Sequence, residues 1–266
     1  MSIILLINII KAKNVFERIG NLLLLYRCSV EPHKEDEMVY KKKRKESQGA
    51  SIIEGSSNEL LPIELPKPKF GRDALVSKAL HQRKTTREIS GKKLPLQVLS
   101  NLLWAACGVN RKVGPFEIPG RTAASASNSQ EIDVYVTMEE GVYLYDPYHH
   151  RLDAVIAGDF RPLAIGAGQA NFMANAPVQL IYVADIHRLS HTSGYQEPGL
   201  LDPEVQKSYY FVDTGMIAAN VYLFAASQRL AAWFHNCNKP ALAEELNLRA
   251  EQRLLFGQTV GYPIKK

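Results

Sequence analysis

The apolar positions that follow residue 70 recur first with the spacing of helices. Residues 73–82 carry apolar side chains at helical intervals, which predicts an amphipathic helix. A second helix is predicted to start at Pro95, because proline is favourable at the first helical position, and to end at Gly108. A third helical stretch is expected at residues 161–173.

Strands are predicted where the apolar pattern alternates or becomes continuous. Residues 132–138 alternate as in a half-buried strand, and a turn at 139–141 joins them to 142–145 in a hairpin. Residues 178–184 are almost continuously apolar, as is typical of a short strand buried on both faces. A last strand is predicted at residues 254–262.

One long stretch, residues 208–227, is apolar on every side. A helix without a polar face has to be interior, either in the core or at a subunit interface. We expect residues 228–236 to form the end of this helix, and a short helix to follow at 240–246. Because helices and strands are mixed without a strict βαβ alternation, the pattern favours the α+β class.

The N-terminal part of the chain differs from the rest. Residues 1–71 are predicted to be a poorly ordered extension and linker, ahead of a folded domain at 72–266. Prolines in residues 61–68 favour extended backbone, so this part is a linker or strap. The apolar runs Ile3–Ile10 and Leu22–Leu25 fall short of the ~20 residues that span a bilayer. We expect no membrane span and a cytoplasmic location, with export as the alternative.

The net charge of +5 also belongs mainly to this N-terminal part. Residues 1–47 hold 10 Lys and Arg against 6 Asp and Glu, which is +4 and leaves about +1 for residues 48–266. No basic stripe interleaved with aromatic residues follows, so nucleic-acid binding is disfavoured. The widely spaced Cys28, Cys107 and Cys237 form neither a disulfide framework nor a zinc pattern, and we expect no metal site.

Candidate chemistry begins directly after the first predicted helix, at Gln-Arg-Lys-Thr-Thr-Arg in residues 82–87. On an extended backbone Arg83, Thr85 and Arg87 point to one side and Lys84 to the other. Guanidinium groups with hydroxyls suit a phosphate and its neighbouring hydroxyls or carbonyls. A solvated basic loop is the alternative interpretation.

A second candidate stretch, residues 120–130, is rich in small side chains that let a planar ligand lie close to the backbone. Ser125, Asn128 and Gln130 offer donors and acceptors without net charge, which suits the polar edge of a heterocycle. A polar turn before the strand is the alternative.

Aromatic residues mark a third candidate stretch near residue 234. Trp233 and Phe234 either roof a pocket or belong to the core, and His235 could titrate near neutrality as an acid or base, although the sequence identifies no partner for it.

Five short motifs follow one another along the chain. They are Arg-Lys-Thr-Thr-Arg at 83–87, Leu-Leu-Trp-Ala-Ala-Cys-Gly at 102–108, Arg-Thr-Ala-Ala-Ser-Ala-Ser-Asn-Ser-Gln at 121–130, Asp-Thr-Gly-Met-Ile-Ala-Ala-Asn-Val at 213–221 and Val-Gly-Tyr-Pro at 260–263. This series resembles the FMN-dependent nitroreductase family, in a short form related to the SagB-type oxidases. The resemblance covers about residues 72–266.

The chain departs from the family at three points. Ala124 stands where many members have proline, Glu131 follows Gln130 where many have Pro-Trp, and the chain is truncated soon after Pro263.

The resemblance implies a nitroreductase-like fold, with a mixed central sheet flanked by helices, and an intertwined homodimer that holds FMN at its interface. Arg83, Lys84, Thr85 and Arg87 match the segment that contacts the FMN phosphate, the ribityl chain and the N1/C2=O edge. A guanidinium at Arg87 would stabilise the negative charge that develops near N1 when the flavin is reduced.

Further cofactor contacts are implied by the same resemblance. The residues expected to reach FMN from the partner subunit are small or uncharged: Ala124, Ser125, Ala126, Asn128 and Gln130. Trp233 belongs to the stretch that matches the lining of the N5 face, and Lys265 or Lys266 replaces C-terminal cations at the phosphate. No side chain is expected to be catalytic, because the chemistry takes place at flavin N5.

The activity implied is a ping-pong oxidoreduction, in which NADH or NADPH reduces FMN and a nitroaromatic, quinone or similar small acceptor then takes the electrons. Two alternatives stay open. One is a SagB-like, FMN-dependent dehydrogenation of azoline rings in a modified peptide, and the other is a flavin-binding protein without turnover.

Overall fold

The computed structural model describes residues 60–69, 76–166, 175–193 and 201–264. Contacts divide the chain into two units, Met1–Ser57 and Asn58–Lys266, and all described residues belong to the second. The expected disorder of the N-terminal extension, and the start of the first helix, lie outside the described residues.

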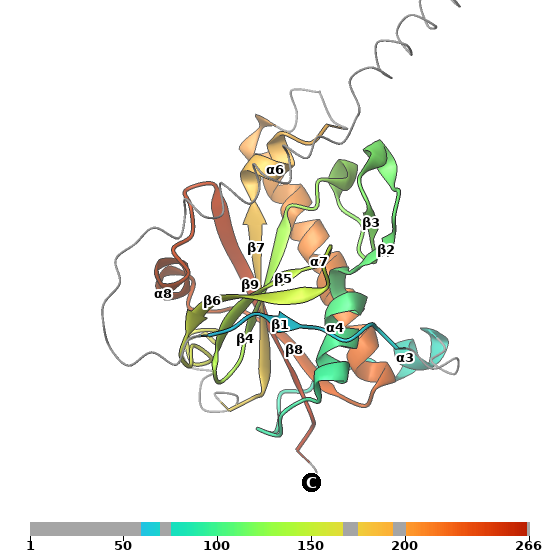
Figure 1. Cartoon of the computed structure of the whole chain (residues 1–266), viewed down its shortest axis with the longest axis vertical. Helices are drawn as coiled ribbons and strands as arrows, with labels where there is room; N and C mark the ends of the chain where they lie inside the picture. Colours follow the sequence, from blue (N-terminus) through green and yellow to red (C-terminus); the bar gives the residue numbers. More distant parts are fainter. Residues whose placement is uncertain (1–59, 70–75, 167–174, 194–200, 265–266) are drawn as a thin grey trace, which may run out of the picture. The chain divides into compact units, whose positions relative to one another are not determined.

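Seven strands form one central sheet (Figure 1). In spatial order they are β1 (Ile63–Glu64), β6 (Arg151–Ala157), β5 (Gly141–Asp146), β4 (Ile132–Thr137), β7 (Val178–Asp185), β9 (Gln252–Gly261) and β8 (Ala231–His235). Every pairing among these described strands is antiparallel, so the expectation of a mixed sheet is wrong. The reason is topological: β4, β5 and β6 form a meander of short turns, whereas a parallel neighbour would need a crossover connection.

The helices pack on both sides of this sheet. They are α3 (Val76–Gln82), α4 (Leu96–Cys107), α6 (Ile186–Ser190), α7 (Pro203–Ser227) and α8 (Lys239–Glu245), with the short 3₁₀ turns η1 (Pro115–Glu117) and η2 (Ala126–Asn128). A separate hairpin joins β2 (Val109–Arg111) to β3 (Gly120–Arg121). The α+β class is therefore confirmed. None of the helices described is long and apolar enough to cross a bilayer.

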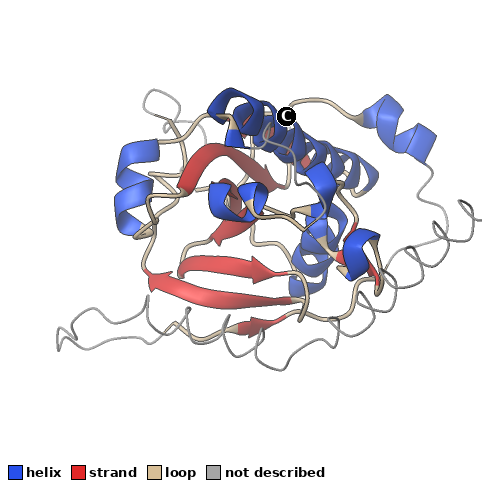
Figure 2. Cartoon of the chain, turned by 90° about the horizontal axis from the view of Figure 1, so that it is seen from above, coloured by secondary structure: helices blue, strands red, loops and turns tan. Residues whose placement is uncertain are grey.

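Strand β7 is buried on both faces, as its apolar run predicts, and it explains why the core has two layers. Leu180 and Tyr182 belong to the cluster that includes residues of α4 and α7, while Ile181 and Val183 belong to the cluster that includes Leu242 of α8. Alternate residues of a strand point to opposite faces, so one sheet separates α4 and α7 from α8 (Figures 1 and 2).

Two expected helical stretches are not helical. Helix α7 ends at Ser227, and Arg229 then adopts a left-handed conformation (φ 56°). Residues 231–235 form β8, which pairs with β9, because sheet pairing and the strand preference of Trp233 and Phe234 override the helical preference of the two alanines. Residues 161–166, the described part of the stretch expected at 161–173, form turns. Strand β6 was not predicted.

The proline-rich strap is held to α4 by polar side chains of that helix. The Gln97 amide donates to the Lys67 carbonyl oxygen at 3.0 Å, and the Asn101 amide donates to the Lys69 carbonyl oxygen at 2.8 Å. Ser100, which is fully buried, donates to the Pro66 carbonyl oxygen. Polar residues on a core-facing helix are thus explained by the backbone that they satisfy.

Ser100 is also the end of a buried hydrogen-bond chain. Its hydroxyl hydrogen is used by Pro66, so its oxygen accepts from Nε2 of His150 at 2.9 Å. Nδ1 of His150 then accepts from the Tyr145 hydroxyl at 2.9 Å. Burial lowers the pKa of His150, which is consistent with a neutral ring in this position.

We predict that Ser100→Ala lowers the free energy of unfolding by about 1 kcal/mol, since it removes the buried hydroxyl that binds both the Pro66 carbonyl oxygen and the half-buried His150 ring. Urea unfolding followed by circular dichroism measures this loss. Ser77→Ala, an exposed serine-to-alanine change on α3, is the matched control and should be nearly neutral. Equal effects of the two variants would contradict this account of the strap.

Candidate functional site

The cationic segment, which we define as residues 83–87, runs along the open edge of the sheet beside β8. It leaves α3 at Arg83, whose N–H donates to the Ala79 carbonyl, and Thr86 N–H then donates to the Ala232 carbonyl at 3.0 Å. Just beyond the segment, Ser90 N–H donates to the Tyr262 carbonyl, and Ile89 pairs with Pro263. These bonds fasten the segment and the residues that follow it to the end of the sheet.

Side chains of this segment contact aromatic rings. The Arg83 guanidinium lies 5.5 Å from the centroid of Tyr222, and the Thr85 hydroxyl is 3.1 Å from the Tyr222 hydroxyl. Arg87 instead lies over Trp233, with its guanidinium carbon 5.0 Å from the ring centroid. The structure thus brings together Arg83 and Thr85, and separately brings together Arg87 and Trp233.

Among the described residues, the cations of this segment form no ion pair with a carboxylate. Within the described ranges, the ion pairs of the chain involve other side chains, and Arg83, Lys84 and Arg87 are all exposed. Exposed cations held beside an aromatic ring suit an anionic ligand with a planar part. Lys265, the expected C-terminal cation, lies outside the described residues.

The second candidate stretch, which we call the small-residue loop (residues 122–130), is conformationally unusual. Ser127, Asn128 and Gln130 all have left-handed backbone angles, with φ of 48°, 54° and 52°. Such angles are uncommon outside glycine, and clusters of them are found where a surrounding structure enforces them.

Two carboxamides in this loop are directed into the protein. The Asn128 amide donates to the carbonyl oxygens of Pro115 and Ile118, at 3.2 and 3.3 Å, in the connection between β2 and β3. The Gln130 amide donates to the Pro119 carbonyl oxygen at 2.6 Å and to Asn128 Oδ1 at 2.9 Å. The Tyr148 hydroxyl donates to Gln130 Oε1 at 2.7 Å. Both side chains therefore fasten the hairpin to the loop.

Residues 124 and 125 of the loop are more available for contact with a ligand than these two carboxamides. Ser125 Oγ accepts from Gln130 N–H at 3.0 Å, and Ala124 is exposed. Asp213 of α7 accepts from the Ala126 N–H at 2.8 Å, which fixes the centre of the loop on the long helix.

Both ring nitrogens of His235 are engaged in hydrogen bonds. Nδ1 is 2.8 Å from the Asn236 carbonyl oxygen and therefore carries the hydrogen, so Nε2 accepts from the Thr259 hydroxyl at 2.8 Å. Burial lowers the pKa of His235. The ring is a structural link between β8 and β9, and its neighbour Trp233 lies in a strand, rather than at the helix end expected from the sequence.

Helix α7 places the two candidate stretches on opposite sides of itself. The cationic segment contacts Tyr222 and the small-residue loop contacts Asp213, nine positions earlier. Nine residues are two and a half helical turns, or roughly 14 Å, so the two contacts lie on opposite faces. One protomer therefore does not present both stretches to the same small ligand.

Part of α7 faces solvent although it is apolar. Val212 and Met216 are 55% and 48% exposed, and Gly215 and Ala219 are exposed beside them. These four residues, which we call the open face of α7, recur at helical spacing. The expectation of an interior helix therefore holds for one side of α7 within a single protomer.

Hollows near the two stretches are small. A groove of about 260 Å³ lies between α3, α4 and α7, lined by Trp104, Asn220 and Phe224 among others. This is less than the roughly 300 Å³ at which ligand pockets begin. A cavity of about 10 Å³, roughly the size of one water molecule, lies between Asp213, Gln130 and Ser125.

Tyr222 and Asp213 are site residues that the sequence reasoning did not single out. Each is a polar residue in an otherwise apolar helix, and Asn220, which donates to the Ala106 and Thr122 carbonyls, is another. A polar side chain in an apolar helix indicates a specific partner, so this signal was present in the sequence.

Comparisons with known proteins identify relatives of the chain. The sequence profile of the nitroreductase family matches residues 80–262. A solved structure from Ralstonia eutropha JMP134, provisionally named a nitroreductase, is 32% identical with a TM-score of 0.66, covering 82% of this chain and 97% of that chain. A Methanocaldococcus jannaschii protein, also provisionally named a nitroreductase, is 30% identical over 176 residues, or 64% of this chain and 80% of the relative.

A more distant structure shares the fold alone. In the Escherichia coli microcin synthetase McbBCD complex with truncated pro-MccB17 bound, a chain matches with a TM-score of 0.55 at 16% identity, covering 91% of this chain and 98% of that chain.

We predict that Gln130→Ala frees the β2–β3 hairpin without unfolding the protein, since it leaves the Pro119 carbonyl and the Tyr148 hydroxyl without partners. Trypsin should cut after the exposed Arg111 and Lys112 roughly tenfold faster, as expected if local opening becomes easier by about 1.4 kcal/mol. Gln228→Ala, at the exposed end of α7, is the control. An unchanged cleavage rate would contradict the role assigned to Gln130.

Proposed function

We propose, since the chain belongs to the nitroreductase family, that it is an FMN-dependent oxidoreductase that passes electrons from NADH or NADPH to a small acceptor such as a nitroaromatic or a quinone. The observation that carries this proposal is the cationic segment: three exposed cations without ion pairs among the described residues, next to the ring of Trp233.

The donor set of this segment fits FMN. Arg83 and Lys84 would hold the phosphate, because guanidinium and ammonium groups bind phosphate oxygens by charge-assisted hydrogen bonds. Arg87 would face the N1/C2=O edge, and its position over Trp233 restricts the directions in which its guanidinium can point. When bound, FMN supplies the two-electron chemistry, while the protein supplies position and electric field.

A second copy of the chain is needed to complete this site. The small-residue loop contacts the opposite side of α7, so the loop that reaches a given FMN would come from the partner subunit. The open face of α7 would form the interface, since Gly215 and Ala219 let another helix backbone approach while Val212 and Met216 become buried. We therefore propose a homodimer with a twofold axis near α7.

Within that loop, the contacts to FMN fall to the groups that the protomer leaves available. These are the Ser125 hydroxyl hydrogen and the backbone of Ala124, because the Ala126 N–H already donates to Asp213 and the Ala126 carbonyl accepts from Ser129. Asn128 and Gln130 would support the loop from behind, because their carboxamides bind the hairpin.

The absorbance spectrum of the purified protein tests the cofactor, and NAD(P)H oxidation in the presence of menadione tests turnover. We expect a flavin spectrum and, for a ping-pong scheme, parallel lines in double-reciprocal plots. A flavin spectrum without turnover would instead favour a binding protein, and a protein that stays colourless after incubation with FMN would contradict the proposal.

We predict that Arg87→Ala weakens FMN binding by about 1.5–3 kcal/mol, or roughly 10–150-fold, because a charge-assisted hydrogen bond is lost. The reduction potential of the bound flavin should also fall, since the reduced form gains most from a nearby cation. Fluorescence titration and potentiometry measure the two effects. Lys78→Ala removes an exposed charge from α3 outside the segment and should change neither quantity.

We predict that Met216→Glu, on the open face of α7, converts a dimer to monomers, because it buries an unpaired charge at the interface. Light scattering after size-exclusion chromatography measures the mass. Val155→Glu is the matched control, since Val155 is an exposed apolar residue (40%) on strand β6. A wild-type protein that elutes as a monomer, or a variant that stays dimeric, would contradict the proposed interface.

A further inference from the structure

Two buried carboxyl groups meet beneath the small-residue loop. Asp213 projects from α7, is 5% exposed, and accepts the Ala126 N–H through Oδ2 at 2.8 Å. Glu131, at the start of β4, has no exposed surface and accepts from the Ser129 hydroxyl through Oε2 at 2.6 Å. The pair thus joins the loop to the long helix.

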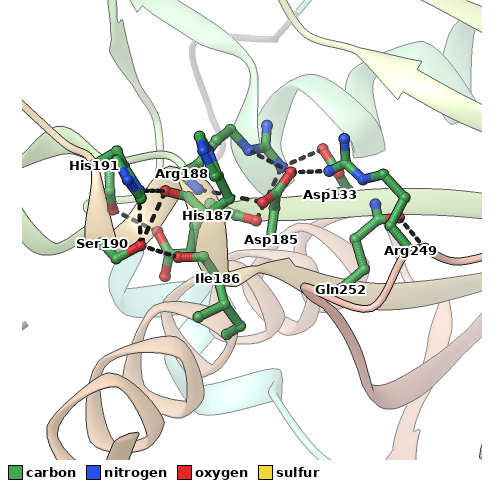
Figure 3. A network of polar contacts seen from close by, with 11 residues as sticks. Asp133, Asp185, Ile186, His187, Arg188, Ser190, His191, Arg249 and Gln252 are labelled. Carbon is green, nitrogen blue, oxygen red and sulfur yellow. Dashed lines mark hydrogen bonds and ion pairs between the residues drawn. The ribbon is translucent and has the colours of Figure 1, made fainter. Parts of the chain in front are cut away.

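Glu131 is held in place by its backbone. Its carbonyl oxygen accepts from Asp185 N–H at 2.9 Å and from the Arg188 guanidinium at 3.0 Å. Arg188 in turn pairs with Asp133 at 2.8 Å, and Arg249 pairs with Asp185 at 2.5 Å (Figure 3). This network fixes the backbone from which the Glu131 carboxyl extends.

The side chain of Glu131 is not satisfied by its neighbours. Its Oε1 is buried and has no hydrogen-bond partner apart from what Asp213 can offer, as far as the described residues show. Neither carboxyl makes an ion pair with a described residue, although Arg121 and Cys107 line the same small cavity as Asp213. A buried, unpaired carboxylate is costly, so two of them in contact require a proton between them.

The titration of Asp213 agrees with this geometry. Burial, the charge of Glu131 and the hydrogen bond to Glu131 raise the pKa of Asp213 to about 7. Asp213 therefore keeps its proton below neutrality, where it can donate it to Glu131, and loses it above neutrality. Arg188 and Asp133, on the Glu131 side, are already paired with one another.

We propose that Glu131 and Asp213 are positioning residues for the cofactor, which hold the small-residue loop against α7 through one shared proton and release it when that proton is lost. This inference rests on the proposed function, because the loop is expected to contact FMN. When both carboxyl groups are ionised, their like charges repel each other, which weakens the contact between the small-residue loop and α7. The loop then moves from the position in which Ala124 and Ser125 face the cofactor, and FMN binds more weakly at alkaline pH.

The test is the dissociation constant of FMN between pH 5.5 and 9, for the full chain and three variants. We expect the wild-type affinity to fall above neutrality, by up to about tenfold per pH unit if one proton is linked to binding. Asp213→Asn mimics the protonated pair, since its amide donates to Glu131 while its oxygen still accepts from Ala126. Its affinity should match the wild type at pH 6 and stay level at higher pH.

Two further variants complete the design. Asp213→Ala removes the carboxylate that accepts the Ala126 N–H, so this variant should bind FMN weakly at every pH. Asp202→Asn, at the exposed start of α7, is the matched control and should keep the wild-type pH profile. A wild-type affinity that does not change with pH, or an Asp213→Asn profile equal to the wild type, would overturn the inference and leave the proposed function standing.

A wild-type protein that binds no FMN at any pH would instead contradict the proposed function. The pair is then tested by the unfolding midpoint against pH. An aspartate whose pKa is raised on folding stabilises the fold least when ionised, so stability should fall as the pH rises from about 4, the ordinary pKa of an unfolded aspartate, to about 7, and should level off above that value. Asp213→Asn should lack this fall, and equal profiles for the two proteins would refute the shared proton.

Discussion

Helix α7 separates the two halves of the site that a single flavin would need. Tyr222 receives the cationic segment on one side of the helix, and Asp213 receives the small-residue loop on the other, two and a half turns away. A rigid helix cannot bring these contacts together within one chain. The same helix leaves an apolar side exposed, so the separation and the open face both favour a twofold partner.

The rest of the fold supports this helix. The sheet and α4 together bury one side of α7. The cationic segment lies along the edge strand β8 and is hydrogen-bonded to it. On the far side, the β2–β3 hairpin and the acid pair hold the small-residue loop in a backbone conformation that few residues adopt freely. The candidate site thus consists of two loop segments, one of them with a strained backbone, fastened to helices and strands, which is how binding groups are usually positioned.

Local patterns predicted the elements that have a distinct apolar run or residues that mark their ends. Strand β7 and helix α4 follow from their apolar runs and from Pro95 and Gly108. The pattern could not identify β8, because two alanines favour a helix while Trp233 and Phe234 suit a strand, and pairing with β9 decides between them. In the same way, Asn128 and Gln130 were expected to face the cofactor, and their long-range bonds to hairpin carbonyls are invisible in the sequence. The contact of Arg83 and Thr85 with one ring agreed with their period-two spacing.

A mixed-dimer experiment tests the central claim, that each FMN is held by the cationic segment of one subunit and the small-residue loop of the other. Arg87→Ala disables the segment, and Ala124→Trp blocks the loop. Each variant alone should bind FMN poorly, but unfolding and refolding the two together should produce hybrid dimers that hold about one FMN, because one of their two sites is intact. No recovery of FMN binding in isolated hybrid dimers would show that both stretches act within a single chain.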